Sequence, residues 1–266
     1  MLYRDLLPDR AGGSLIVSLI RIEEDGEVPD WVHYHRVRFQ LIYIVCGWVE
    51  VVYEGQGAPF VLRPGDFVTQ PPTIRHRVLH CSRGLEVLEV SAPAEHATLA
   101  DHDHALPGGR AVAAGGEGLF GGQRFVRHVA AEEREAGGGG EEARGDSGAG
   151  ASFSWLESGV GEATAGLARV RIGRRTGASL ACGGGGGEGG RQDEAMDVHD
   201  EAMTILFVAR GGATVEAPGG GESGEPVPLA EGDCLTLPPG QPFRVTPSSD
   251  DGARVLDIRL GIEAFA

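Results

Sequence analysis

The sequence predicts an all-β protein with two double-stranded β-helix (jelly-roll) barrels in tandem. Apolar residues come in short runs rich in Val, Ile, Leu and Phe, with Gly and Pro between the runs and little helical periodicity. Many short strands joined by tight turns are typical of an antiparallel sandwich or barrel. One pattern of polar and turn residues also occurs twice, and 266 residues leave room for about two domains.

The expected strands follow from short stretches of β-forming residues that end at Gly, Pro, Asp or Ser. In the first half they are Ser14–Ile22, Val37–Val45, Trp48–Tyr53, Pro59–Leu62, Asp66–Thr69, Arg75–His80 and Leu85–Ser91. In the second half they are Ser152–Glu157, Leu167–Ile172, Met203–Val208, Ala213–Glu216, Cys234–Leu237, Phe243–Thr246 and Arg254–Leu260.

The repeated pattern relates the two halves. His33 and Asp197 are 164 residues apart, and Gly65 and Gly232 are 167 apart. The phrase Gly-Asp-Phe-Val-Thr-Gln-Pro-Pro at Gly65 returns as Gly-Asp-Cys-Leu-Thr-Leu-Pro-Pro at Gly232. A repeat of this length indicates two similar domains rather than a solenoid.

We expect an N-terminal domain over residues 1–106, a connector over 107–150 and a C-terminal domain over 151–266. The connector is rich in Gly, Ala and Glu, and its Gly137–Gly140 run is followed by two Glu, so it buries too little apolar surface to order itself. Gly183–Gly190 and Pro218–Gly224 are expected to be loops of the second domain. They lack the strand-then-helix context of a nucleotide-binding glycine motif.

Charge and composition exclude several classes of partner. The net charge of −16 repels phosphate backbones and anionic headgroups, and no basic run offsets it, so we expect no nucleic acid and no membrane partner. The first ten residues lack the apolar core of a secretion signal, which favours a cytoplasmic protein. The four Cys are scattered without a Cys-x-x-Cys pair, so we expect thiols rather than disulfides or a zinc knuckle.

The first copy of the pattern carries the residues of a metal site. Alternate side chains share one face of a strand, so His33 and His35 can both point into a barrel and bind one ion. A turn or bulge shortly after them would bring Gln40 to the inward face of the next strand, and His76 lies on a later strand. We expect His33, His35 and His76 as metal ligands, with Gln40 as a fourth ligand or bonded to a metal-bound water.

These residues resemble the two-part signature of the cupin superfamily. That signature runs Gly, His-x-His, an acidic residue and Gly, then Gly-x5-Pro-x-Gly-x2-His. The matches here are Gly26, His33, His35, Gln40 and Gly47, then Gly65, Pro71 and His76. The whole chain resembles a bicupin because both halves fit the spacing. The resemblance implies one divalent transition metal per chain, with Fe(II) favoured and Mn, Ni, Cu or Zn as alternatives, and it leaves a homodimer open.

Two residues depart from the signature. Gln40 stands where the family has a glutamate, and Thr73 stands at the Gly of the Pro-x-Gly turn. A glutamine oxygen can bind a metal but carries no charge, so three imidazoles and one amide leave the charge of a divalent ion uncompensated. Such a site favours anionic ligands and makes the bound metal a stronger Lewis acid.

The second copy has lost half of these donors. Asp197 and His199 stand at the paired positions, but Thr204 and Phe243 replace the other two. Two donors are too few for a tight metal site. We expect a structural or lid-forming second domain. The alternative is that Asp200-Glu201 supplies a further carboxylate and so completes a metal site there.

His80 and Tyr53 are the candidate catalytic residues of the first domain. His80 is two same-face steps beyond His76 and is either a base near the metal or a core histidine. Tyr53, like Tyr43 and Trp48, either lines the pocket or simply packs.

Two further groups of residues have open interpretations. Arg36, Arg38, Arg75 and Arg77 either capture a carboxylate or enolate substrate or lie solvated on the outer face. His102 and His104 form a second His-x-His that belongs to a surface loop or to a lid over the barrel.

Three functions fit these residues. The first, which we favour, is a mononuclear non-haem iron dioxygenase that binds a small anionic (carboxylate, enolate or phenolic) substrate at a neutral ligand set. The second is a redox-silent metal-dependent lyase, isomerase or hydrolase in which a base such as His80 or Tyr53 moves a proton. The third is a binding module without turnover, since one fold can carry all three.

Overall fold

The computed structural model of the chain describes residues 1–108, 118–132, 152–176, 196–197, 199–218, 225–248 and 252–265. Most of the predicted connector, the Gly183–Gly190 loop and Gly219–Gly224 lie outside the described residues. The chain divides into two compact units. Unit 1 comprises Met1–Gly138, Gly159–Arg169 and Gly261–Ala266, and unit 2 comprises Gly139–Ser158 and Val170–Leu260. The boundaries at residues 106 and 150 stay a prediction.

Short strands make up nearly all of the regular secondary structure described in the first half of the chain. They are β1 (Leu2–Asp5), β2 (Ile16–Ile22), β3 (Gly26–Glu27), β4 (His33–His35), β5 (Phe39–Cys46), β6 (Val49–Tyr53), β7 (Phe60–Leu62), β8 (Phe67–Thr69), β9 (His76–Cys81), β10 (Leu85–Ala92), β11 (Thr98–Ala100), β12 (Leu119–Phe120), β13 (Gln123–Arg124) and β14 (Val126–His128), with one helical turn, α1 (Arg10–Gly13).

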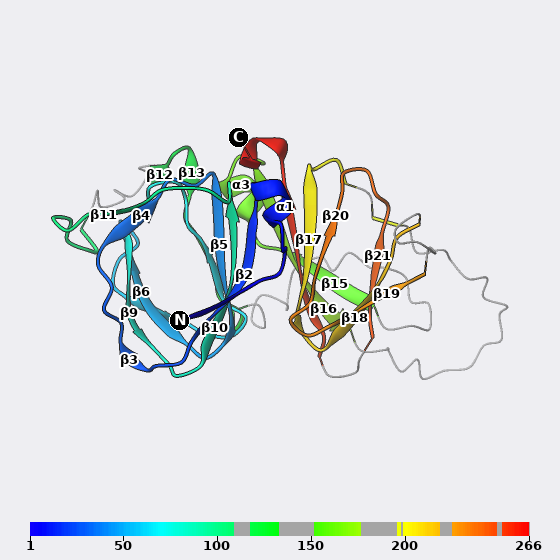
Figure 1. Ribbon diagram of the computed structural model, residues 1–266, viewed down its shortest axis with the longest axis horizontal. Helices are drawn as coiled ribbons and strands as arrows, with labels where there is room; N and C mark the ends of the chain where they lie inside the picture. The colour runs from blue at the N-terminus through cyan, green and yellow to red at the C-terminus, as the bar shows by residue number, and fades with distance from the viewer. Residues whose placement is uncertain are drawn as a thin grey trace. The chain divides into compact units, whose positions relative to one another are not determined.

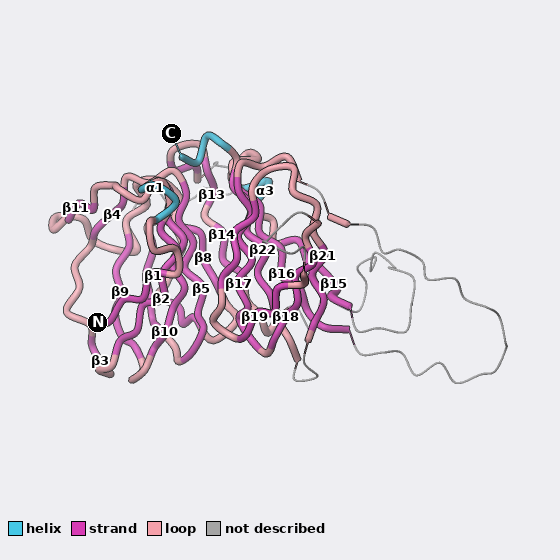
Figure 2. Tube along the Cα trace, turned by 45° about the vertical axis from the view of Figure 1, so that its right-hand side comes forward, coloured by secondary structure: helices cyan, strands magenta, loops and turns pink. Residues whose placement is uncertain are grey.

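The second half is built in the same way. Its strands are β15 (Ser152–Glu157), β16 (Ala168–Thr176), β17 (Met203–Arg210), β18 (Gly212–Glu216), β19 (Val227–Ala230), β20 (Cys234–Leu237), β21 (Arg244–Pro247) and β22 (Arg254–Leu260), with helix α3 (Val160–Ala163) and the 3-10 helix η1 (Ile262–Phe265). Figure 2 shows how strongly strands dominate the described chain. None of its helices is long and apolar enough to cross a membrane.

Most strands of unit 1 form two facing antiparallel sheets (Figure 1), and β12 and β13 form a separate two-stranded sheet. One sheet has the order β1-β2-β10-β5-β8-β14, and the other has β11-β4-β9-β6-β7 with β3 paired to β9. The chain crosses from one sheet to the other after β2, β4, β5, β7, β8, β9 and β10. This alternation is that of a jelly roll. Strand β14, which follows the first part of the predicted connector, adds to the first sheet through β8.

Unit 2 repeats the arrangement with fewer strands. Its sheets have the orders β15-β16-β22-β17-β20 and β19-β18-β21. The prediction of an all-β chain with two jelly-roll barrels is therefore confirmed.

Inward-facing apolar side chains fill each barrel. In unit 1 the buried cluster includes Ile44, Val51, Leu62, Val68 and Ile74, and in unit 2 it includes Leu206, Val208, Val215, Leu237 and Val255. Each such side chain contributes about 1.5–3 kcal/mol when fully buried.

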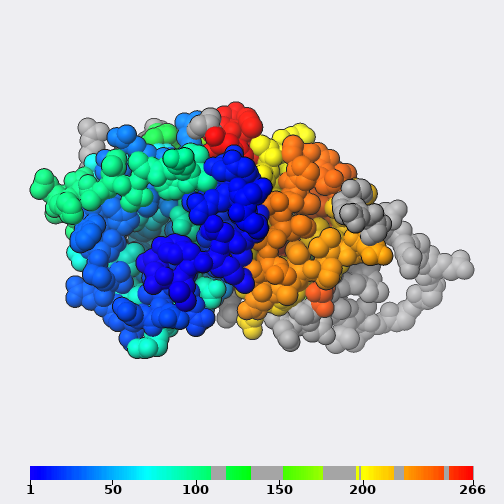
Figure 3. Space-filling model, in the orientation of Figure 1, coloured from blue at the N-terminus to red at the C-terminus, as the bar shows by residue number. Residues whose placement is uncertain are grey.

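One glycine and one edge strand complete unit 1. Gly47 joins β5 to β6 with φ +77°, and a Cβ there would approach Leu85 Cα to 3.0 Å, so this position requires glycine. Strand β1 is exposed along its length, and the N-terminal segment lies at the surface in Figure 3.

Candidate metal centre

Three imidazoles meet inside the first barrel. His33 and His35 lie on β4, and His76 begins β9, where it is the register partner of His33. One ligand atom of each ring lies within 4.8 Å of those of the other two. The ring centroids of His33 and His76 are 4.3 Å apart, and His35 is 5.2 Å from both. Within the described ranges, these residues form the one group of three His, Cys, Asp or Glu side chains close enough to hold a metal.

An outer partner anchors one nitrogen of each ring. The contacts are His33 Nδ1 to Trp31 O at 2.8 Å, His35 Nδ1 to Thr98 Oγ1 at 2.9 Å and His76 Nδ1 to Ile74 O at 3.1 Å. A carbonyl oxygen only accepts, so Nδ1 carries the hydrogen in His33 and His76 and Nε2 keeps its lone pair. Outer contacts of this kind fix the tautomer and the direction of a metal-binding histidine.

Burial keeps two of the three rings neutral. Burial and the neighbouring His33 lower the pKa of His35 to about 4, and the same causes together with His35 lower the pKa of His76 to about 3. Burial alone would also lower the pKa of His33, but its hydrogen bonds to Asp30 and Trp31 raise it above its usual value. Only a neutral imidazole can bind a metal, so His35 and His76 are ready ligands at neutral pH.

Gln40 lies on β5 with an oxygen that lacks a partner. The residue is 2% exposed and shares its face with Ile42 and Ile44, which pack inside the barrel. Its Nε2 donates to Glu89 Oε1 at 2.9 Å, and its Oε1 is buried without a hydrogen-bond partner in the described part of the chain. Such an orphaned atom costs about 1–3 kcal/mol, which a bound cation would offset. Three imidazole nitrogens and this amide oxygen fit a divalent transition metal, although direct binding by Gln40 stays a prediction.

The turn before His76 contains Thr73, one of the two departures from the signature. Thr73 adopts φ +67°, in the left-handed region that favours glycine and strains a β-branched residue. Its N–H donates to His35 O at 3.0 Å, so the strained turn ties the strand of two ligands to the segment that leads into the third. Strain held by surrounding contacts is common near functional sites.

Tyr53 lies inside the barrel beside His76. Its ring stacks on His76 with centroids 5.3 Å apart, and its Oη accepts a 2.7 Å hydrogen bond from Gln70 Nε2. Burial raises the pKa of its hydroxyl well above the usual 10. Tyr53 is therefore a neutral phenol next to the ligand cluster, and its catalytic role stays a prediction.

The expectation that His80 shares the inward face of His76 is wrong. The pairing of β6 with β9 shifts register between Glu50 and Val51, so Leu79 is an extra residue on β9 that reverses the alternation of faces. His80 is 48% exposed, and its Nδ1 lies 2.7 Å from Glu50 Oε2. Its position gives no support to the catalytic role that was predicted for it.

The arginine cluster is partly engaged elsewhere. Arg75 pairs with Asp101 at 2.6 Å and with Glu54 at 3.4 Å, and Arg38 Nε donates to Glu263 O at 3.1 Å. Arg36 is exposed and Arg77 is half-buried. These positions favour the outer-face interpretation over substrate capture.

The second His-x-His is at the surface. His102 is exposed and makes an edge contact with the exposed ring of Trp31, with centroids 5.8 Å apart. His104 Nε2 lies 3.3 Å from Gly108 O. Tyr43 is buried and Trp48 is half-buried.

Three residues that contact His33, His35 and Gln40 are not part of the signature. Asp30 lies 3.4 Å from His33, Thr98 bonds His35 from the neighbouring strand β11, and Glu89 bonds Gln40 from β10. The acidic residue three positions before His33 was a usable signal for Asp30. Thr98 and Glu89 are far from their partners in the sequence and become visible only through strand pairing.

The second barrel keeps the geometry of the site with different groups. The rings of His199 and Phe243 are 5.9 Å apart, which repeats the pair His35–His76 of the first barrel. Asp197 bridges to Phe243 as His33 does to His76. His199 and Thr204 are buried, and both ring nitrogens of His199 and the Thr204 hydroxyl lack hydrogen-bond partners within the described residues.

In the second barrel two arginines bind Asp197, the residue that corresponds to His33. Arg259 Nη2 lies 2.5 Å from Asp197 and 2.9 Å from Asp257, and Arg171 binds the same two carboxylates. Asp257 is fully buried and Arg259 is 4% exposed. The two guanidinium groups already bind the carboxylates of Asp197 and Asp257. The network therefore favours a structural role for this barrel. The absence of a metal from it stays a prediction.

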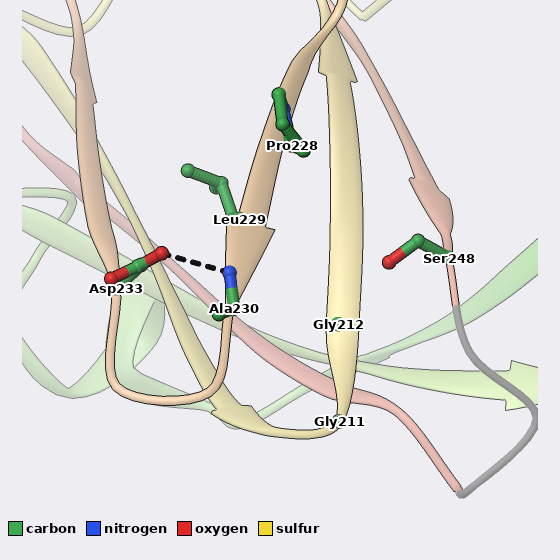
Figure 4. Close-up of a pocket in the computed structure, with 7 residues that line it drawn as sticks. All are labelled: Gly211, Gly212, Pro228, Leu229, Ala230, Asp233 and Ser248. Atoms are coloured by element: carbon green, nitrogen blue, oxygen red, sulfur yellow. Dashed lines mark hydrogen bonds between the residues drawn. The ribbon is translucent and has the colours of Figure 1, made fainter.

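A hollow of about 570 Å³ lies elsewhere on unit 2 (Figure 4). It is lined by Gly211, Gly212, Pro228, Leu229, Ala230, Asp233 and Ser248. The one ionisable side chain among these, Asp233, accepts a 2.8 Å hydrogen bond from Ala230 N and so serves the local turn. The hollow shares no residue with the network of Asp197, and its lining offers no catalytic group.

Comparison with known proteins agrees with this architecture. A family model described as "Cupin domain" matches residues 18–91, the stretch that holds all three histidines and Gln40. Residues 18–91 therefore match the cupin domain family. No curated protein matches the sequence significantly.

Solved cupin structures resemble most of the chain. A salicylate 1,2-dioxygenase from Pseudaminobacter salicylatoxidans has a TM-score of 0.58 and 15% identity, covering 93% of this chain and 71% of its own. The gentisate adducts of salicylate 1,2-dioxygenase from the same organism give 0.58 and 14%, with 93% and 68% covered. A deletion mutant of Bacillus subtilis oxalate decarboxylase gives 0.57 and 14%, with 97% and 72% covered. At such identities the likeness shows a shared cupin fold and no shared reaction.

Proposed function

We propose that this cupin is a mononuclear non-haem iron dioxygenase that acts on a small anionic substrate: a carboxylate, an enolate or a phenol. The observation that carries the proposal is the ligand set. Three imidazoles, with His76 buried and His33 and His35 half-buried, lie close enough together to share one ion. Gln40 on the inward face of β5 has an orphaned amide oxygen, so the donor set contains no carboxylate.

A neutral ligand set leaves the metal with its full charge. His33, His35 and His76 would hold the ion and Gln40 would complete the set, so an anionic substrate is the natural source of neutralising charge. Ferrous iron suits imidazole ligands and, when bound, supplies a site at which an anion and dioxygen are brought together. The carboxylates of Asp30 and Glu89 lie behind His33 and Gln40, where they orient ligands rather than occupy the metal.

The barrel walls supply the remaining parts. Apolar side chains such as Ile42, Ile44 and Val78 surround the interior and exclude water from it. Tyr53, neutral and stacked on His76, can donate a proton or a hydrogen bond to a substrate oxygen. We assign this role to Tyr53 rather than to the exposed His80.

The structural relatives support this substrate class. Salicylate, gentisate and oxalate, which appear in the names of the similar structures, are all small carboxylates. The oxalate decarboxylase also keeps a redox-silent lyase, isomerase or hydrolase as the alternative function. A binding module without turnover is the third.

Oxygen uptake tests the proposal. The metal-free protein is loaded with Fe(II) or with Zn(II) and given salicylate, gentisate or a small diketone in an oxygen electrode. We expect uptake that depends on iron and on one of these substrates and that disappears in His76→Ala. Substrate conversion by the zinc form without oxygen would assign the redox-silent class, and tight anion binding with no conversion by either form would assign the binding module.

A further inference from the structure

We propose that Glu89 is a positioning residue that sets the direction of the Gln40 amide and thereby places its oxygen on the metal. The inference rests on the metal site of the proposed function but not on its reaction. It explains how a glutamine can replace the usual glutamate and still present an oxygen to a cation.

The sheet register brings the two side chains to one face. Strand β10 pairs with β5 so that Ser91 is opposite Gln40 and Glu89 is opposite Ile42. Gln40 and Glu89 are thus diagonal neighbours on the inward face, a distance that long side chains can span. Gln40 Nε2 donates to Glu89 Oε1 at 2.9 Å, and Ser91 Oγ donates to the same oxygen at 2.8 Å.

The chemistry of the pair permits one direction of the amide. A glutamine side chain has a donor end and an acceptor end that differ little in shape, so packing alone does not choose between them. An ionised carboxylate only accepts, which draws the NH₂ end of Gln40 toward Glu89. The Oε1 end is left buried and without a partner in the described chain, available to a cation. The reverse direction would aim two N–H groups at a positive ion.

Glu89 is well placed for this task. Ser91 is fully buried, and its hydroxyl holds the same oxygen that accepts from Gln40. Glu89 itself is half-buried, so its charge is partly solvated and need not be cancelled by a second cation. The family signature has a carboxylate at the position of Gln40. Here the carboxylate of Glu89 is hydrogen-bonded to Gln40 instead.

Cobalt binding by the metal-free full chain tests the inference without turnover. Affinity for Co(II) is measured by competition with a chelator for the wild type, Glu89→Leu, Glu89→Gln, Ser91→Ala and Gln40→Leu. Glu89→Leu removes the acceptor, and we expect about 10–100-fold weaker binding. Glu89→Gln keeps an acceptor oxygen but adds an NH₂ group that can donate, so it fixes the amide less firmly, and we expect a loss smaller than that of Glu89→Leu. Ser91→Ala keeps the Gln40–Glu89 bond but removes one support of Glu89, and we expect a smaller loss of affinity than in Glu89→Leu.

A double-mutant cycle shows whether Glu89 acts through Gln40. In the Gln40→Leu background, adding Glu89→Leu should change cobalt affinity by less than about twofold, because there is no amide left to orient. Additive losses, or equal losses in Glu89→Leu and Glu89→Gln, would overturn the inference in favour of a general charge effect. Wild-type protein that fails to bind cobalt would overturn the metal site as well, whereas an intact cycle without oxygen uptake would overturn only the proposed reaction.

Discussion

Replacing Arg259 by Met should destabilise the second barrel strongly. Arg259 Nε donates to Asp257 Oδ1 at 3.1 Å, and its Nη2 reaches Asp197 at 2.5 Å. Asp257 is fully buried, so the variant leaves a buried carboxylate with Arg171 as its remaining cation. Breaking a buried ion pair on one side costs about 3–5 kcal/mol, because the desolvation penalty of the remaining charge stays while half of its compensation is lost.

Urea unfolding followed by tryptophan fluorescence measures this loss. Trp155 lies under Arg171, with 4.9 Å from the guanidinium carbon to the ring, so its emission reports on the network. The control is Arg124→Met, which breaks an exposed pair with Glu162 and should cost about 1 kcal/mol or less. Adding Asp257→Leu to Arg259→Met should recover part of the stability, since the uncompensated carboxylate is gone. A loss below about 1 kcal/mol in Arg259→Met would refute the view that the guanidinium groups hold this barrel together.

Three further predictions concern the first barrel and the thiols. Thr98→Val removes the partner of His35 Nδ1 at 2.9 Å and should weaken Co(II) binding about tenfold in chelator competition, whereas an unchanged affinity would mean that the contact does not orient the ring. In the metal-free protein His35 and His76 have pKa values of about 4 and about 3, below the ordinary 6.5. Between these values the unfolded chain binds protons that the folded chain does not bind. His33, whose pKa is raised, acts in the opposite sense. The free energy of unfolding should therefore be highest near about pH 6.5 and fall by about 1–3 kcal/mol per pH unit toward pH 4, with a smaller slope in His76→Phe, and an equal slope in both proteins would contradict the assignment. Burial raises the pKa of Cys81, and raises that of Cys234 to about 12, while Cys46 is exposed, so Cys46→Ser should remove one rapidly reacting thiol in a disulfide-exchange assay and Cys234→Ser none.

Most of the fold and the cluster of three histidines could be predicted from the sequence, because both depend on local pattern. Alternation along β4 places His33 and His35 on one face, and Gln40 returns to the inward face as its spacing from Ile42 and Ile44 indicates. The paired motifs at a nearly constant separation predicted two barrels. Strand alternation and motif spacing are properties of the chain itself, so no tertiary information was needed.

The residues that sequence reasoning missed depend on pairing between distant strands. The face of His80 was reversed by one extra residue in β9, a bulge that no local signal announced. Glu89 and Thr98 meet Gln40 and His35 only through the registers of β10 and β11. In the second barrel Asp197 was weighed as a metal donor, whereas its carboxylate is held by Arg171 and Arg259 from strands that the motif does not include.

Elemental analysis of the protein purified without chelators or metal-affinity steps tests the central claim most directly, with His76→Ala prepared in parallel. A site of three histidines with a fourth donor should retain about one transition-metal ion per chain in the wild type and lose it in the variant. Iron as that ion is the result predicted for a dioxygenase. Equal metal content in the two proteins, or a wild type that binds none when metal is supplied, would contradict a functional metal centre at His33, His35 and His76.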